Sequence, residues 1–393
     1  MKQKILILAP YVPIYSSGGG GAVIYNYIKT LSQSYTVDVI CFSTRRPNDL
    51  TQLQMVCNKL EVVPLNKINA IFNCVYNLFS HNPFRLAYVS SVKMREQVRY
   101  AMERESYDLI FANHERMAPY AMLFKDTRRI IDLHDLVSLR HKQLLSIERN
   151  PIKWLINFVE SYRMRQFEKM IPNYFDIVLL GNSWEVCLLR EKRRTENIMI
   201  APRGIEVESF NKHIEAIPNT IIFLGTLNYQ PNEDACLYFS KKILPLILKS
   251  IPAVKFYIVG NKPTKAILKL AKNKNIIVTG YVPDTLEYLK KAAVMVCPLR
   301  VGTGIRIKIL EAMAAGRPVV STTIGYLGIE ATNMQNIVIA DKPQDFADLT
   351  IRLLRDIDFY KKIAEGGREL VLKKYDINKN LQSLNRIIET ING

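Results

Sequence analysis

The chain has 393 residues, of which 48% are hydrophobic and 23% are charged, and its mean hydropathy is close to zero. This length predicts two domains, each with its own core, and no apolar run approaches the ~20 residues that span a membrane. Positions 1–200 hold 27 basic and 18 acidic residues, or half of the formal charge of +18, so the charge is not confined to one basic domain that would bind nucleic acid.

Neither the cysteines nor the histidines are spaced as metal ligands. The six cysteines include no C-x-x-C pair, and the five histidines are dispersed. We therefore expect no metal site, and reduced thiols as in a cytoplasmic protein. The opening stretch MKQKILILAPYVP has an apolar run too short for a signal peptide, and it predicts a first strand over residues 4–10.

A run of glycines follows this strand and precedes a helix: Gly18, Gly19, Gly20 and Gly21. A glycine loop at a helix start suits an anionic group, because backbone N–H groups point out of the helix N-terminus. The run lacks the G-x-G-x-x-G spacing, and no acidic residue ends the next strand, VDVICFS, which disfavours a nicotinamide dinucleotide. The alternative is a flexible turn.

Two later segments are apolar on one helical face. Residues 68–79 precede a basic stretch, a combination compatible with a membrane surface or a lipid-linked acceptor, although packing on a sheet is the commoner outcome. A helix over residues 152–170 carries an aromatic stripe that we expect to lie in the core: Trp154, Phe158 and Tyr162.

Several expected strands of the first half end in polar residues. Residues 108–112 lead into Asn113 and His114, and residues 129–133 lead into His134. Because parallel sheets present functional groups at the carboxyl ends of their strands, both histidines are candidates, with a structural role as the alternative. A strand ending in Arg203 and Gly204 closes a first domain over 1–205, and the polar segment 206–219 is the expected linker.

The second domain, expected over 220–376, opens with strands that end at Gly225, Gly260 and Gly280, and a terminal helix is expected over 377–393. Its most informative stretch runs from 294 to 330. An apolar strand, Val294–Cys297, is followed by a loop with Gly302 and Gly304 and then by a helix.

This loop and helix carry the chemistry of a nucleoside-diphosphate pocket. Arg300, Arg306 and Lys308 could hold phosphates, and Glu311, one turn beyond Lys308, could accept hydrogen bonds from ribose hydroxyls. The alternative is a solvated helix with a Lys308–Glu311 pair worth a few tenths of a kcal/mol.

The stretch resembles the donor-site signature of the retaining GT-B glycosyltransferases of family 4, in the branch that reads P-L-R-x-G-x-G-x-R-x-K-x-L-E-A-M-A-x-G. The match runs from Pro298 to Gly316. The resemblance implies an α/β GT-B fold, with two Rossmann-like, doubly wound domains facing a central cleft and the terminal helix crossing back to the first domain.

The resemblance also implies roles for individual residues. Arg306 and Lys308 would neutralise the leaving diphosphate, and His134 would lie close to the transferred sugar. The donor would further contact Gly225, Gly280, Tyr281, Val282, Arg300, Gly302, Thr303, Gly304 and Glu311. The cleft or acceptor side would include Gly18, Gly19, Gly20, Gly21, His114 and Arg203.

The chain departs from the family pattern at three positions. Thr303 stands where the signature often has its first glutamate, a departure that the P-L-R branch shares. Thr226 stands where many relatives carry an arginine, and Arg203 stands where the family has asparagine. The family is thought to let the donor phosphate assist deprotonation of the acceptor on the same face of the sugar, without a protein nucleophile.

The predicted function is therefore metal-independent, retaining transfer from a nucleotide sugar, such as a UDP-sugar or GDP-sugar, to a glycan or lipid-linked acceptor. Bacterial relatives commonly build surface polysaccharide or lipopolysaccharide, which suits a basic cytoplasmic protein that visits the anionic inner face of the membrane. The alternatives are a non-catalytic GT-B scaffold or polysaccharide-binding subunit, favoured by Thr303, and a nucleic-acid binder, which the even spread of charge disfavours.

Overall fold

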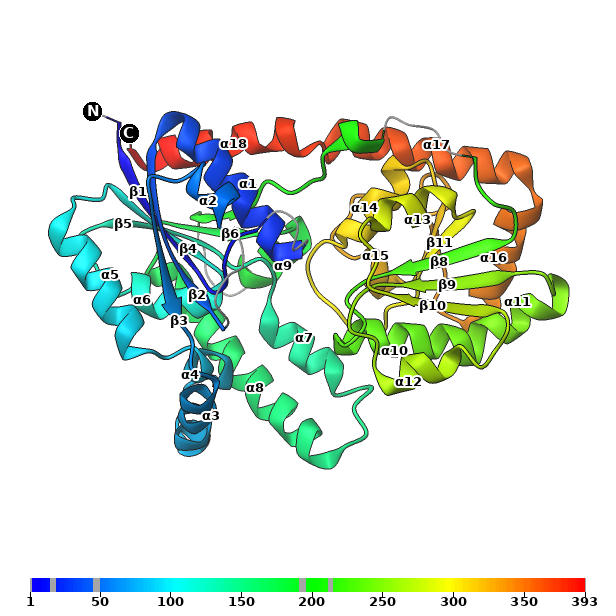
Figure 1. Cartoon of the computed structure of the whole chain (residues 1–393), viewed down its shortest axis with the longest axis horizontal. Helices are drawn as coiled ribbons and strands as arrows, with labels where there is room; N and C mark the ends of the chain where they lie inside the picture. Colours follow the sequence, from blue (N-terminus) through cyan, green and yellow to red (C-terminus); the bar gives the residue numbers. More distant parts are fainter. Residues whose placement is uncertain (1, 15–18, 45–49, 191–195, 211–214, 393) are drawn as a thin grey trace. The chain divides into compact units, whose positions relative to one another are not determined.

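The computed structural model describes residues 2–14, 19–44, 50–190, 196–210 and 215–392 (Figure 1). The chain divides into two compact units. The first comprises Met1–Pro202 with Leu381–Gly393, and the second comprises Arg203–Asn380.

The described part of the first unit is a doubly wound α/β domain. Its sheet has seven parallel strands in the order β3-β2-β1-β4-β5-β6-β7. The strands are β1 (Lys4–Ala9), β2 (Thr36–Ser43), β3 (Lys59–Pro64), β4 (Leu109–Asn113), β5 (Arg128–Asp132), β6 (Ile177–Leu180) and β7 (Ile198–Ile200). The central strands are nearly continuous apolar runs because helices cover both of their faces.

The helices of this unit connect successive strands, with α18 added from the end of the chain. They are α1 (Gly19–Ser34), α2 (Thr51–Gln54), α3 (Lys67–Tyr76), the 3-10 turn η2 (Asn77–Phe79), α4 (Phe84–Tyr88), α5 (Val92–Arg104), η3 (Glu115–Met117), α6 (Ala118–Ala121), α7 (Val137–Leu144), α8 (Pro151–Met170), η4 (Ile171–Asn173), α9 (Ser183–Arg190) and α18 (Ile377–Asn392).

The second unit repeats this architecture with six described parallel strands in the order β10-β9-β8-β11-β12-β13. They are β8 (Thr220–Leu224), β9 (Lys255–Val259), β10 (Ile276–Gly280), β11 (Val294–Cys297), β12 (Val319–Ser321) and β13 (Val338–Ile339). The helical segments are η5 (Val207–Phe210), α10 (Gln230–Tyr238), η6 (Phe239–Ile243), α11 (Leu244–Ser250), α12 (Lys265–Leu270), α13 (Thr285–Lys291), α14 (Ile307–Ala314), α15 (Thr323–Tyr326), α16 (Pro343–Arg355) and α17 (Ile357–Lys374).

The strand order fixes where each unit can hold a ligand. In the first unit the order reverses between β1 and β4, and in the second unit it reverses between β8 and β11. In open α/β sheets, ligands bind beyond the carboxyl ends of the strands at such a switch point. The two doubly wound sheets confirm the predicted fold class, and the switch point of the second unit lies beside the loop that the sequence singled out.

The segment expected as a linker, 206–219, begins inside the second unit instead. Val207 and Phe210, in η5, are buried in that unit's core together with Ile205. The surrounding residues are polar, so these two apolar side chains did not produce a recognisable period. The boundary between the units therefore falls earlier, after Pro202.

Two further expectations about local structure are wrong. The glycine run was expected as a loop, but α1 begins at Gly19, so the glycines after it form helix turns; Gly18 lies outside the described residues. The aromatic stripe of α8 was expected in the core, but Trp154, Phe158 and Tyr162 are 40%, 50% and 61% exposed. Within the described ranges, no helix is long and apolar enough to cross a membrane.

Candidate functional site

The loop between β11 and α14 is folded around the guanidinium group of Arg306. Gly302 and Gly304 have φ values of 150° and 75°, a region that favours glycine. Nη1 of Arg306 donates to the carbonyl oxygens of Thr303 and Gly304, the latter at 2.6 Å. Nη2 is buried and has no hydrogen-bond partner among the described residues. A buried guanidinium nitrogen without an acceptor is suited to an anionic ligand.

Lys308, in the first turn of α14, is a second cation, and an amide and an aromatic ring contact its ammonium group. Its Nζ donates to Oδ1 of Asn232 at 2.9 Å and lies 4.1 Å from the ring centroid of Phe223. Burial lowers the pKa of the Lys308 ammonium from its ordinary value. A cation held by an amide and a ring keeps its charge available for a ligand.

Glu311 follows Lys308 by three positions on α14. Burial raises the pKa of its carboxyl, and the nearby Lys308 opposes that shift. No hydrogen bond within the described ranges involves this carboxylate. Both oxygens are therefore available as acceptors, the property that a ribose contact requires.

Glycines end the neighbouring strands at the same edge of the sheet. The N–H of Gly225 donates to the carbonyl of Val259 at 3.0 Å, and the N–H of Gly260 donates to that of Gly280 at 3.2 Å. A Cβ placed on Gly225 would lie 3.0 Å from Nζ of Lys308, so the turn after β8 directly adjoins the Lys308 ammonium. The absence of side chains at Gly225 and Gly260 lets these turns pack closely against each other and beside the Lys308 ammonium.

The expected base-binding turn, Gly280 to Val282, lies at the end of β10. Gly280 has a φ of 69°, and Tyr281 is 75% exposed. Val282 packs against the core of the second unit. The turn therefore presents its backbone and the Tyr281 ring at the surface.

Arg300 has a different environment from the other two cations. Its Nε donates to Oδ2 of Asp234 at 2.9 Å, and Nη2 pairs with the other oxygen. Its guanidinium also lies 4.7 Å from the ring centroid of Tyr238. Because Asp234 accepts from two of its donors, Arg300 is engaged within the protein. Within the part of the chain that the structure describes, neither Arg306 nor Lys308 donates a hydrogen bond to a carboxylate.

Asn232 also belongs to this site, although no role was predicted for it. It accepts from Lys308, and its Nδ2 donates to the carbonyl of Thr226 at 3.0 Å. Asn232 thus links the end of β8 to the start of α14. It ends the sequence Tyr229-Gln-Pro-Asn232, which lies shortly after Gly225 and before the rest of α10.

The first unit carries its own polar cluster at the ends of β4 and β5. Nδ2 of Asn113 lies 2.7 Å from Nε2 of His134, and Oδ1 of Asn113 is buried without a partner among the described residues. The rings of His114 and His134 are 5.5 Å apart, and both residues have positive φ, at 78° and 65°. A Cβ on Gly20 would lie 3.6 Å from Cε1 of His134, so the start of α1 adjoins this cluster.

A buried carboxylate, that of Glu115, contacts one of the two histidines. Glu115 pairs with His114 and accepts from Nε of Arg85 at 2.9 Å. Although burial alone would raise its pKa, His114 and Arg85 hold the pKa of this carboxyl well below its usual range. Burial lowers the pKa of His114, and the neighbouring Glu115 opposes that shift.

The predicted residues therefore form two sets, one in each unit. Arg203 is buried, and its carbonyl accepts from Nδ2 of Asn380 at 2.6 Å, while a Cβ on Gly204 would meet the carbonyl of Tyr375 at 2.3 Å. Arg203 groups with the second unit rather than with His114 and His134. Among the described residues, no group of three or more His, Cys, Asp or Glu side chains is arranged to hold a metal ion.

A second buried acid, Glu168 in α8, lies next to the β5–α7 connection. Its Oε1 accepts from the N–H of Ser138 at 2.9 Å, and its other oxygen contacts Oγ of the same residue. Burial raises the pKa of Glu168 to about 8, against an ordinary value near 4.5. Between these two pH values the unfolded chain loses a proton that the folded protein keeps, so the free energy of unfolding falls as the pH rises through this window.

Glu168→Gln is expected to remove this pH dependence, because glutamine can accept from Ser138 N–H without ionising. Wild type and variant should be similarly stable near pH 4.5. As the pH approaches 8, wild type should lose stability relative to the variant. Denaturant unfolding at several pH values would measure the difference, with Glu103→Gln, on the exposed side of α5, as the control. Parallel profiles for wild type and Glu168→Gln would contradict the prediction.

Comparisons with known proteins agree with this geometry. Residues 218–356, which contain Arg306, Lys308 and Glu311, match the family described as "Glycosyl transferases group 1". A 44.6 kDa protein in the cps region of Klebsiella pneumoniae is 23% identical over 97% of this chain and 98% of its own length. A phosphatidyl-myo-inositol mannosyltransferase of Mycobacterium leprae is 25% identical over 48% of this chain and 53% of its own length.

Solved structures share the fold of the whole chain. The crystal structure of HepE from Anabaena in complex with UDP has a TM-score of 0.71 at 14% identity, covering 99% of this chain and 100% of that one. At this identity the likeness concerns the fold. The match to the glycosyltransferase family is confined to residues 218–356, whereas the likeness to this structure covers the fold of both units.

Proposed function

We propose that this protein is a retaining glycosyltransferase of family 4 that moves a sugar from a nucleoside-diphosphate sugar to a glycan or lipid-linked acceptor. The observation that carries the proposal is the set on α14 and the loop before it. Two cations without carboxylate hydrogen bonds, Arg306 and Lys308, precede an acceptor carboxylate, Glu311, at the switch point of the second sheet.

The proposed chemistry follows from where charge develops. As the glycosidic bond to the donor breaks, negative charge grows on the leaving diphosphate. Preorganised donors in a desolvated site stabilise such charge most strongly. Nη2 of Arg306 and Nζ of Lys308 are the proposed donors, together with backbone N–H groups of the Gly302–Gly304 loop, and this work requires no metal ion. Glu311 would bind the ribose hydroxyls, and the Gly280–Val282 turn would contact the base.

The proposal for the sugar and for retention rests on the resemblance to the P-L-R branch. Thr303 takes the place of the first glutamate, so sugar contacts would come from backbone groups near Thr303. His134, held by Asn113, is proposed to lie close to the transferred sugar. The donor phosphate would assist deprotonation of the acceptor on the same face.

The relatives suggest the biological setting. The Anabaena protein of similar fold was crystallised with UDP, which favours a uridine diphosphate sugar as donor here. The Klebsiella relative, similar over nearly its full length, lies in a cps region, which favours a role in surface polysaccharide synthesis.

The first test is thermal unfolding of wild type and Glu311→Gln with UDP, GDP, ADP and CMP. A nucleotide at ~100 times its dissociation constant should stabilise wild type by about 2.7 kcal/mol. Glu311→Gln should weaken the binding of that nucleotide roughly 10- to 100-fold, because hydrogen bonds to a charged group contribute about 1.5–3 kcal/mol. Glu287→Gln, which alters an exposed acid of α13, is the matched control.

Two results would contradict the proposal in different ways. If none of the four nucleotides stabilises wild type, the donor site on α14 is wrong. If a nucleotide binds but no nucleotide sugar is turned over with any glycan or lipid-linked acceptor, the protein is a non-catalytic GT-B scaffold, the alternative that Thr303 favours.

A further inference from the structure

Helix α3 of the first unit turns its apolar side away from the protein. Ile68, Ile71, Phe72 and Val75 recur at the spacing that normally faces a core, yet they are between 56% and 68% exposed. The residue that α3 buries is Ala70, on the opposite side. The following turn, η2, continues the exposed side with Phe79, which is 98% exposed.

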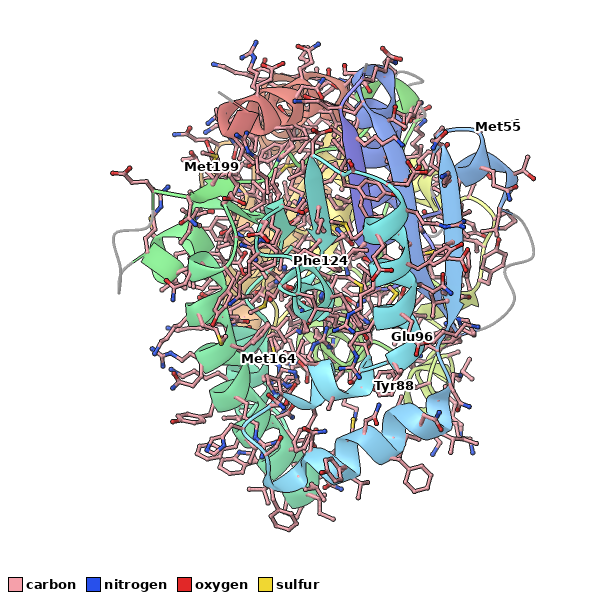
Figure 2. The ribbon with its side chains drawn as sticks, turned by 90° about the vertical axis from the view of Figure 1, so that its left-hand side faces the viewer. Met55, Tyr88, Glu96, Phe124, Met164 and Met199 are labelled. Atoms are coloured by element: carbon pink, nitrogen blue, oxygen red, sulfur yellow. The ribbon has the colours of Figure 1, made fainter. Side chains whose placement is uncertain are left out.

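Helix α8 likewise exposes its apolar side. Its buried side carries the polar residues Asn157 and Glu160, while Trp154 and Phe158 are exposed and stack on each other with ring centroids 5.5 Å apart. Figure 2 shows α3 and the first half of α8 at the lower end of the first unit, with ring side chains pointing away from the sheet. We call the exposed apolar side chains of residues 68–79 and 152–162 the outer apolar face.

Buried polar contacts hold the two halves of this face together. Glu160 of α8 accepts from the backbone N–H groups of Phe84 and Arg85, at 2.7 and 2.9 Å. Arg163 donates to the carbonyl of Leu78 at 2.8 Å and to those of Asn77 and Asn82. Arg163 and Glu160 thus join α8 to η2 and to the start of α4 through hydrogen bonds. The two helical segments therefore form one continuous surface.

The exposed charges along the two chain segments that form the outer apolar face are positive. The chain has no acidic residue between Glu61 and Glu96, or between Glu148 and Glu160. Within these stretches the exposed basic residues include Lys67, Arg149 and Lys153. An apolar surface bordered by lysine and arginine, and rich in Trp, Tyr and Phe, matches the boundary of an anionic bilayer.

We propose that the outer apolar face docks the protein on an anionic membrane surface. The helices lie along the headgroup region, the aromatic and aliphatic side chains insert into it, and the basic residues meet lipid phosphates. Pairing with a second copy through the same face is disfavoured, because it would bring the lysines of two copies together without carboxylates to offset them. This proposal does not depend on the identity of the sugar.

The test is flotation of the full chain with vesicles of phosphatidylcholine alone or mixed with phosphatidylglycerol. Wild type should bind the phosphatidylglycerol vesicles more tightly, and added salt should weaken the binding. In Phe72→Ser with Trp154→Ser, affinity should fall roughly 100-fold, because inserting each aromatic side chain contributes about tenfold. The control, Leu268→Ser with Ile357→Ser, removes two exposed apolar side chains of the second unit and should bind as wild type does.

The outcomes distinguish the occupants of the face. Loss of vesicle binding in the first pair of variants but not in the control supports the proposal. Absence of vesicle binding by wild type, or equal loss in both pairs, overturns it. Wild type that does not bind vesicles could instead form an oligomer, which light scattering would detect. If Phe72→Ser with Trp154→Ser dissociates that oligomer, the face joins copies of the chain. Nucleotide-dependent stabilisation should persist in all variants, which separates this test from that of the donor site.

Discussion

Lys308→Met is expected to lower kcat about 100- to 1,000-fold, with a much smaller change in KM. The Lys308 ammonium would act on charge that grows on the leaving diphosphate, so its contribution is larger in the transition state than in the bound donor. Removing one preorganised donor of this kind costs about 100- to 1,000-fold in rate. The measurement is the steady-state rate with the donor that the nucleotide panel identifies.

The same substitution should change the stability of the protein little. Methionine removes a buried charge whose desolvation is unfavourable, and this offsets the hydrogen bond lost to Asn232. Activity and stability should therefore separate, which a general defect in folding would not produce.

A matched control is available in the same unit. Lys290, in α13, is also buried; its Nζ donates to the carbonyl of Ser209 at 2.9 Å and lies 5.8 Å from the ring centroid of Phe210. Lys290→Met should leave kcat and KM unchanged. If Lys290→Met reduces kcat as much as Lys308→Met does, a direct role for Lys308 in stabilising the leaving group would be excluded.

The donor-side elements were predictable because their signals are local in sequence. A buried strand, a glycine-containing loop and an amphipathic helix follow one another within 294–314, and the structure has them as β11, the loop and α14. Strand order places this unit beside β8, so Gly225 and Lys308 come close although 83 positions separate them. The sequence could indicate which residues gather at the edge, but not which of them are already engaged.

Arg300 shows why the sequence does not indicate which side chains are already hydrogen-bonded within the protein. Arg300 and Arg306 look equivalent in the signature, but Asp234 of α10 occupies the guanidinium of Arg300, and no pattern within 294–314 reports a residue 66 positions earlier. Partners of that kind come from tertiary packing. The same holds for Asn232, whose amide fixes the Lys308 ammonium.

The direction of an amphipathic helix is the other property that periodicity does not contain. The spacing in α8 correctly indicates one aromatic side, but the expectation that this side faces the core is wrong. Asn157 and Glu160 can be buried because His141 and the backbone of α4 supply their hydrogen bonds. Because these polar side chains form hydrogen bonds inside the protein, the aromatic side of α8 can remain exposed and bind another surface.

The donor edge also depends on close contact between two backbone turns, and Gly260→Ala is expected to disrupt it. A Cβ on Gly260 would lie 1.8 Å from the carbonyl oxygen of Gly225, and Gly260 has a φ of 152°. The clashing atom belongs to the backbone, so no rotamer change relieves it, and the ends of β8 and β9 must separate. Overpacking and backbone strain each cost about 1–3 kcal/mol, so the second unit should lose about 3 kcal/mol or more.

Gly280→Ala separates steric contact from backbone strain. Gly280 also has a positive φ, of 69°. Apart from its two chain neighbours, no described residue has an atom within 4 Å of a Cβ placed there, so its expected cost is the left-handed strain alone, about 1–2 kcal/mol. Denaturant unfolding of both variants, with and without the stabilising nucleotide, compares them. Because Gly260 holds the turn beside Lys308, Gly260→Ala should also abolish nucleotide-dependent stabilisation; equal stability of the two variants would mean that the turns after β8 and β9 are not in contact.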